Sequence, residues 1–288
     1  MKRIFSIGWM LISLLMSVSF ASCSSDDDDD EPVKKEQTDK NDNSSKDNGD
    51  NLSDNNSGDD SGNSSTDHKS DVKPDAVDLG LPSGTLWATF NVGATAPEEY
   101  GSYFAWGEIE PKSNYNWRTY KWVQEGRTTW IYITKYTVAD NQKYGIWYND
   151  DTFVGDNKTE LDAADDAAIA HFGSNWRMPT IGEWEELKDD KNCTWTWTTE
   201  NGVYGYKVTS NKEGYTNNSI FLPACGYHED DFENDGWYGY YWSRSLDPDN
   251  SYFAQRLYFY SNDSNYVEIS SLYRNDGLSV RAVYSAAD

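Results

Sequence analysis

The chain has 288 residues, of which 15% are aromatic, and carries a formal net charge of −25. Its length is enough for one domain with a sizeable core in addition to an extension. Phosphate recognition needs clustered Lys and Arg, and the sequence has no such cluster, so this acidic composition argues against binding to nucleic acid or to anionic lipid surfaces.

The first 22 residues have the layout of a secretory signal. Lys2 and Arg3 precede an apolar stretch over residues 4–20, and the small residues Ala21 and Ser22 come directly before Cys23. This arrangement looks like a bacterial lipobox, in which cleavage leaves Cys23 at the N-terminus as the lipid anchor. The alternative is an ordinary secretory signal followed by an incidental cysteine. We expect residues 1–22 to be a lipoprotein signal peptide.

A run of five aspartates at residues 26–30 follows the cysteine. It resembles the surface-export signal of Bacteroidetes lipoproteins, which implies an outer membrane lipoprotein exposed on the cell surface. The other interpretation is a solvated acidic tether, as charge runs usually are. Both descriptions can hold together, because residues 24–75 contain 17 acidic and 6 basic side chains and no aromatic residue. Such a segment cannot bury enough apolar surface to fold, so we expect residues 23–75 to be a lipid anchor and a disordered tether.

The aromatic residues gather in a folded head over residues 76–288, whose first elements are a strand and two helices. Residues 84–93 read as a strand, and residues 161–173 as a helix with Asp162 as its cap and with Ala164, Ala168 and Phe172 on one face. The second helix begins at Thr180, which forms a capping box with Glu183. Pro179 and Trp184 stand at hydrophobic-staple positions, and Trp184 and Leu187 should face inward together.

The remainder of the head is predicted to be strands. Residues 193–210 alternate in the manner of a hairpin around Asn201-Gly202, and residues 219–223 read as a buried central strand. Residues 255–270 predict a second hairpin, and residues 277–285 a closing strand. Cys193 and Cys225 do not fall opposite each other in this register, so buried thiols are favoured over a disulfide.

Several of these stretches carry a family likeness. Residues 77–108, 165–168, 176–180, 193–210, 219–227, 239–245 and 277–283 together resemble the Fibrobacter succinogenes major paralogous domain, which is similar to domains in surface lipoproteins of gut Bacteroidetes. The resemblance implies an α+β, C-type-lectin-like fold: two main helices packed on a mixed, largely antiparallel sheet with long irregular loops.

The same fold group includes the formylglycine-generating enzymes, and residues 176–187 resemble one of their conserved stretches. That chemistry needs a reactive cysteine pair in the C-terminal part of the domain, and no cysteine follows Cys225. We therefore predict no catalytic residue and interpret four residues as structural, with buried, paired charges tying the second helix to the closing strand: Arg177, Thr180, Glu183 and Arg281.

Residues 228–236 concentrate acidic side chains, and flexible acidic loops supply the oxygen ligands that calcium takes. Candidate calcium ligands are Asp230, Asp231, Glu233 and Asp235. The alternative is an exposed acidic loop, since the spacing is not that of an EF-hand. No other cofactor is predicted.

The region from Trp237 to Asp276 is rich in Tyr, Ser, Asn and Asp, a mixture that binding surfaces favour. Aromatic rings can stack on sugar rings while Asn and Asp reach the hydroxyls. Candidate ligand-binding residues are Trp237, Tyr238, Tyr240, Tyr241, Trp242, Asp247, Asn250 and Tyr252. The alternative is that several of these aromatics face the core; Tyr258 and Tyr260 should share one face of their strand.

The sequence thus favours a non-catalytic surface lipoprotein that binds a glycan or a protein, in adhesion. A structural or fimbria-associated surface component is the alternative, and an enzyme of the formylglycine-generating type ranks third.

Protease added to intact cells should remove the head, because the acidic run predicts display on the outer surface. Immunoblots of the head before and after cell lysis measure this, with a periplasmic protein as the protected control. Complete protection of the head until lysis would contradict surface display.

Overall fold

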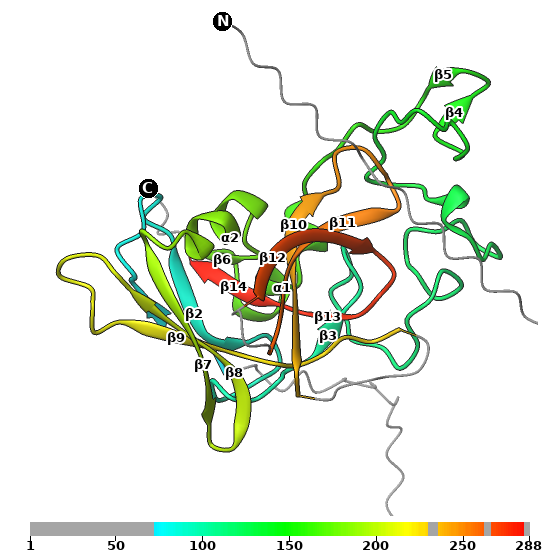
Figure 1. Cartoon of the computed structure of the whole chain (residues 1–288). Coiled ribbons are helices and arrows are strands. Elements are labelled where there is room, and N and C mark those ends of the chain that lie inside the picture. Colours follow the sequence, from blue (N-terminus) through cyan, green and yellow to red (C-terminus); the bar gives the residue numbers. More distant parts are fainter. Residues whose placement is uncertain (1–71, 230–235, 262–265, 285–288) are drawn as a thin grey trace, which may run out of the picture. The chain divides into compact units, whose positions relative to one another are not determined.

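The computed structural model describes residues 72–229, 236–261 and 266–284. The predicted signal peptide, the predicted lipid anchor Cys23 and the predicted tether as far as residue 71 lie outside these residues. The described part is mostly sheet with two α-helices, α1 (Ala167–Phe172) and α2 (Ile181–Lys188), which is the α+β class expected (Figure 1). None of its helices is long and apolar enough to cross a membrane.

Two larger sheets organise the fold. The four-stranded sheet has the order β1 (Ala76–Val77), β2 (Leu86–Asn91), β14 (Arg281–Tyr284) and β6 (Trp176–Arg177). The five-stranded sheet has the order β12 (Tyr266–Tyr273), β11 (Phe253–Tyr260), β10 (Tyr238–Leu246), β13 (Leu278–Ser279) and β3 (Tyr103–Phe104), and β10 and β13 are parallel within it. The predicted closing strand is therefore two short strands, one in each sheet.

Two hairpins complete the sheet structure. The strands β7 (Cys193–Glu200) and β8 (Val203–Ser210) form the predicted hairpin, with Asn201 and Gly202 both at positive φ as the Asn-Gly turn requires. Strand β9 (Ser219–Pro223) pairs with β8. Strand β9 is buried, as predicted, but it is an edge strand rather than a central one. Its second edge packs beside β2 without forming a strand pair. Strands β4 (Tyr148–Asn149) and β5 (Thr152–Phe153) form a separate small hairpin.

The start of α2 confirms the capping box. The Thr180 side chain accepts a hydrogen bond from the Glu183 backbone N–H, and the Glu183 carboxylate accepts one from the Thr180 N–H. Trp184 and Leu187 are fully buried and face inward, as predicted. The Trp184 ring lies 4.6 Å from the ring of Trp87 in β2, so this helix is fixed on the four-stranded sheet.

The predicted cap of the first helix is wrong. Helix α1 begins at Ala167 and is capped by Asp166, which accepts hydrogen bonds from Ala168 N and Ile169 N and also from Met178 N beside β6. Asp162 instead pairs with Lys135 and Lys158 and precedes a separate turn of 3₁₀ helix, η2 (Ala163–Asp165). Ala164 is consequently exposed, whereas Ala168 and Phe172 are buried as expected.

The four-stranded sheet is buried on both faces. Trp87 and Val283 point to one cluster with Trp184, Leu222, Tyr241 and Phe259, whereas Ala88 and Ala282 point to another with Phe104, Phe172 and Trp242. Successive residues of β2 and β14 therefore alternate between two cores. Cys193 and Cys225 are buried and unbonded, as predicted.

The predicted ion-pair link from α2 to the closing strand is only half present. Arg177 pairs with Glu183 through two contacts of 2.6 Å, but Arg281 has no carboxylate partner among the described residues. Its fully buried guanidinium donates to Asn91 Oδ1 and to the carbonyls of Ala88, Thr89 and Phe221 at 2.8–3.2 Å. Arg281 is structural, but it joins β14 to β2 and β9 rather than to α2.

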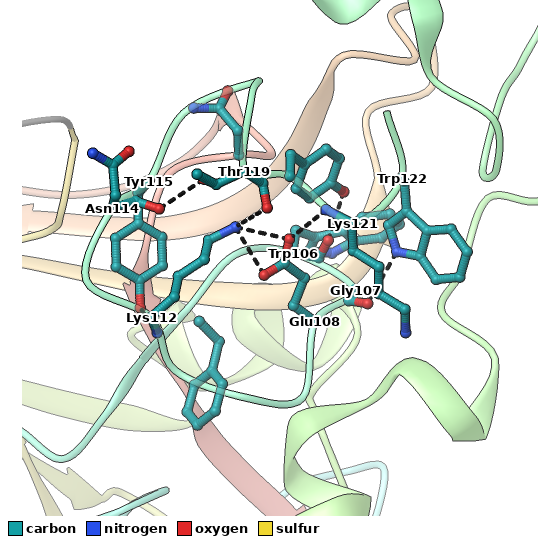
Figure 2. Close-up of polar contacts among 12 residues, drawn as sticks. Trp106, Gly107, Glu108, Lys112, Asn114, Tyr115, Thr119, Lys121 and Trp122 are labelled. Carbon is teal, nitrogen blue, oxygen red and sulfur yellow. Dashed lines mark hydrogen bonds and ion pairs between the residues drawn. The ribbon is translucent and has the colours of Figure 1, made fainter. Parts of the chain in front are cut away.

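A long irregular segment over residues 105–147, with one turn of 3₁₀ helix, η1 (Trp130–Tyr132), is held by side-chain hydrogen bonds. Figure 2 shows Lys112 Nζ donating to Glu108 at 2.8 Å and to the Thr119 carbonyl at 3.1 Å. The fully buried Arg274 donates from Nε to Tyr120 Oη at 2.6 Å and from its other nitrogens to the carbonyls of Lys135, Tyr136 and Ser251. This second buried arginine ties the irregular segment to the end of β12.

Replacing Arg281 should destabilise the head strongly. The substitution Arg281→Ala removes the guanidinium donors to the buried oxygens of Asn91, Ala88, Thr89 and Phe221, which should cost about 3 kcal/mol or more. Thermal unfolding of the full-length protein measures this. Arg118→Ala, an exposed control, should change stability by less than about 0.5 kcal/mol. An unchanged melting temperature for Arg281→Ala would contradict the structural role.

Acid should weaken the Arg177–Glu183 link. Burial alone would raise the pKa of the Glu183 carboxyl, but hydrogen bonds from Arg177, Thr85 and Thr180 outweigh it and lower that pKa from 4.5 to about 2. A group whose pKa is lower in the folded state stabilises the fold above its unfolded pKa, and that stabilisation is lost as pH falls through 4.5 toward about 2.

Melting temperatures across this acid range measure the contribution. Glu183→Gln should be less stable than wild type at neutral pH and should lose less on acidification. Glu213→Gln, at an exposed position, should follow the wild-type curve. Parallel curves for wild type and Glu183→Gln would refute the linkage.

Candidate functional site

The hairpin β11–β12 and strand β10 carry a cluster of tyrosines on one face. In the antiparallel register Tyr238 lies opposite Tyr260, Tyr240 opposite Tyr258, and Tyr260 opposite Tyr266. Residues at alternate positions of paired strands lie on the same face of a sheet, so these five side chains share a face, as predicted for Tyr258 and Tyr260. Together with Tyr227 they form what we call the tyrosine face: Tyr227, Tyr238, Tyr240, Tyr258, Tyr260 and Tyr266.

The rings of the tyrosine face touch one another. Tyr258 is central: its ring lies 4.8 Å from that of Tyr240, 5.7 Å from Tyr260 and 6.0 Å from Tyr266. Tyr227 extends the cluster, with its ring 4.7 Å from that of Tyr240. None of the six is fully buried, and Tyr238 and Tyr266 are each 37% exposed. Two exposed tyrosines continuous with four half-buried ones form a partly exposed aromatic patch, and such patches often mark binding sites.

Arg256 lies at the inner end of the tyrosine face, two residues before Tyr258. Its guanidinium carbon is 4.7 Å from the ring centroid of Tyr240 and 4.8 Å from that of Tyr258, the range of cation–π contacts. The side chain is 8% exposed, and burial lowers the pKa of Arg256. Among the described residues it has no hydrogen-bond or ion-pair partner, and Nε and Nη1 are both covered and unbonded.

Two predicted ligand-binding residues belong to the core instead. Tyr241 is fully buried, and its hydroxyl donates to the Pro223 carbonyl at 2.6 Å. Trp242 is fully buried, and its indole N–H donates to the Phe104 carbonyl at 2.8 Å. Tyr241 points to the opposite face of the sheet from Tyr240. Trp242 points to the same face as Tyr240, but at its position that face is covered by core residues that include Phe104 and Trp106. The prediction of a surface role for these two residues is wrong.

Trp237 is exposed but lies in a different aromatic group from Tyr238. Its ring is 5.9 Å from that of Tyr204, and Tyr204 is 6.0 Å from Trp197, with interplanar angles of 13° and 7°. We call Trp197, Tyr204 and Trp237 the ring row. Alternation along the chain separates Trp237 from Tyr238, so the ring row and the tyrosine face lie on opposite sides of the start of β10.

The last three predicted residues lie at the other end of the β10–β11 hairpin. Asp247 Oδ1 accepts hydrogen bonds from the backbone N–H groups of Asp249 and Asn250, and Oδ2 accepts one from the Ser271 hydroxyl, so Asp247 and Asn250 build the turn. Tyr252 packs on Trp130, with ring centroids 4.5 Å apart. The eight predicted ligand-binding residues thus occupy four separate places, and only Tyr238 and Tyr240 belong to the tyrosine face.

The structure adds Arg256 and four tyrosines that the sequence interpretation did not select: Tyr227, Tyr258, Tyr260 and Tyr266. The signal for part of this set is present in the sequence, because Arg256, Tyr258 and Tyr260 occur at every second position of one predicted strand. Which side of that strand faces solvent depends on the core packing of Leu257 and Phe259, which no local pattern determines.

The candidate calcium ligands Asp230, Asp231, Glu233 and Asp235 lie outside the described residues. Within residues 72–229, 236–261 and 266–284, no group of three or more His, Cys, Asp or Glu side chains could hold a metal ion.

The two cysteines and two histidines of the described head make contacts inside the protein. Burial raises the pKa of the Cys193 thiol to about 12, and it also raises that of Cys225, whose sulfur accepts a hydrogen bond from the Ser279 hydroxyl. Thiols of this kind stay protonated at neutral pH and are poor nucleophiles. His171 bonds through Nε2 to the Ile109 carbonyl, and His228 packs against the rings of Tyr103 and Tyr115.

Comparison with known proteins gives no match: no family model, no curated protein and no solved structure matches this chain.

Proposed function

We propose that this protein is an outer membrane lipoprotein, anchored through Cys23 and displayed on the cell surface, whose C-type-lectin-like head binds a glycan without catalysis in adhesion. The tyrosine face is the binding surface in this proposal. The observation that carries it is the cluster of six tyrosines in ring contact, five of them on one face of β10, β11 and β12, with Tyr238 and Tyr266 exposed and the other four half-buried.

The architecture supports the C-type-lectin-like assignment. That fold has a pair of helices, a mixed sheet and a long irregular region. The described head has α1 and α2, a five-stranded sheet with one parallel pairing, and the irregular segment over residues 105–147.

Tyrosine rings suit a saccharide for a physical reason. The flat ring covers the apolar face of a sugar, and the phenolic hydroxyl bonds to sugar hydroxyls, with little side-chain entropy lost on binding. The mutual contacts of Tyr240, Tyr258 and Tyr260 restrict these rings before a ligand arrives, which reduces the entropy lost further.

A non-catalytic role is supported by the protonated, buried thiols of Cys193 and Cys225, which do not suit them as nucleophiles. An enzyme of the formylglycine-generating type would need such a cysteine to be reactive.

One observation favours a second candidate function, a structural or fimbria-associated surface component. Strand β12 is the last strand of the five-stranded sheet, and an unpaired strand edge can receive a strand from another chain. In that case the tyrosine face would be covered by a protein subunit.

A pair of tyrosines on the same strand tests the binding surface. Tyr266 and Tyr273 are the first and last residues of β12 and are 37% and 41% exposed, but Tyr273 lies outside the tyrosine face and packs on Phe253. On an array of glycans and host-matrix proteins, Tyr266→Ala should bind its glycan at least about tenfold more weakly than wild type, and Tyr273→Ala should bind normally.

The array also separates the alternatives when probed with calcium and again with chelator. Binding that survives the chelator supports the aromatic surface, whereas chelator-sensitive binding would assign the ligand to the acidic loop at 228–236. Loss of binding in Tyr204→Ala, with Tyr266→Ala unaffected, would move the site to the ring row. Binding to a protein but to no glycan would favour the structural role.

A further inference from the structure

We infer that Arg256 binds the carboxylate of an acidic saccharide, such as a hexuronic or nonulosonic acid, within the tyrosine face. The inference rests on the proposed glycan binding and specifies the chemical class of the sugar.

The described head shows how this fold ordinarily satisfies a buried arginine. Arg274 and Arg281 are fully buried, and each donates to several oxygens at 2.6–3.2 Å. Arg256 is more than nine-tenths buried, yet within the described residues its guanidinium donates no hydrogen bond. A buried guanidinium without acceptors is unfavourable, so its retention beside an exposed aromatic cluster points to an acceptor that arrives from outside.

The contacts of Arg256 leave its guanidinium without a hydrogen-bond acceptor. The cation–π contacts with Tyr240 and Tyr258 supply no oxygen acceptor for the N–H groups, which lie along the edges of the planar guanidinium. A planar carboxylate can accept two parallel hydrogen bonds from such an edge. Nη2 is the guanidinium nitrogen that is not covered, so a carboxylate would reach Arg256 through Nη2.

Among the residues that the structure describes, no acidic side chain supplies this acceptor. Glu268 lies opposite Tyr258 and acts electrostatically on Arg256, but it forms no ion pair with it and accepts a hydrogen bond from the Tyr266 hydroxyl. The residue opposite Arg256 in the register is Ser270, which carries no charge.

A saccharide fits this surface better than an acidic peptide. The tyrosine face offers one cation among six neutral rings, on a chain of net charge −25. A run of acidic residues would meet only one positive charge and would be repelled by the remainder of the protein. A sugar acid brings a single carboxylate together with a ring that can stack on tyrosine.

Matched saccharides test the inference with the full-length protein purified in detergent. The probes are a methyl galacturonoside and a monosialylated oligosaccharide, which carry one carboxylate each, and each is compared with its methyl ester, which keeps the ring and removes the charge. Wild type should bind at least one acid about tenfold more tightly than its ester. Arg256→Met should bind acid and ester equally, and Arg118→Met should behave as wild type.

The melting temperatures of the unliganded variants test whether Arg256 stabilises the fold. Because Arg256 donates no hydrogen bond within the described head, Arg256→Met should melt at the wild-type temperature or above it. The acid should raise the melting temperature of wild type and leave that of Arg256→Met unchanged. A marked loss of stability in Arg256→Met would overturn the inference.

The remaining outcomes separate this inference from the proposed function. If esters and neutral glycans bind as well as acids, glycan binding stands and the role of Arg256 fails. If only sulfated sugars bind, the carboxylate assignment fails. If no saccharide binds, both fail.

Discussion

The placement of the last described residues, Arg274 to Tyr284, constrains the remainder of the head. Strand β13 lies between β10 and β3, and β14 lies between β2 and β6, so this short segment occupies the interior of both larger sheets. A fully buried arginine stands near each end of it, and neither has a carboxylate partner among the described residues. Because Arg274 and Arg281 bond to carbonyls of distant segments, satisfying two buried cations requires the irregular segment, β2 and β9 to be in place together.

The same arrangement creates the tyrosine face. Strand β13 takes one edge of β10, which leaves the other edge for the hairpin β11–β12. One side of this hairpin is buried by Leu257 and Phe259. On the other side of the hairpin, Ala254 is buried in the core with Trp242. The core residues do not cover Tyr258, Tyr260 and Tyr266, which stay partly exposed. The aromatic surface is therefore the uncovered end of a face that is core at its other end, and Arg256 lies at the boundary.

Local patterns predicted the parts of the fold that local chemistry determines. The capping box of α2 and the Asn201-Gly202 hairpin depend on residues a few positions apart, and both are present. The choice between Asp162 and Asp166 as the cap depends on Lys135, which pairs with Asp162, and on Met178, which donates to Asp166, and both partners are distant in sequence from the carboxylates they contact. Tyr241 and Trp242 have the composition of a binding surface, but their burial follows from β9 and Phe104, which no pattern in residues 237–252 reveals.

Arg256 differs from the other two buried arginines in the hydrogen-bond acceptors around its guanidinium, and this difference corresponds to a difference in role. Arg274 and Arg281 lie where the surrounding chain supplies oxygens, and the result is a satisfied core. At Arg256 the surroundings are aromatic rings, which stabilise the face of a cation but accept no conventional hydrogen bond in its plane. Proteins tend to break the rule that buried polar groups are satisfied at sites where a ligand completes them. Of the three buried arginines of the described residues, only Arg256 has a guanidinium without an acceptor, and it lies at the margin of the tyrosine face, which is what connects it to recognition.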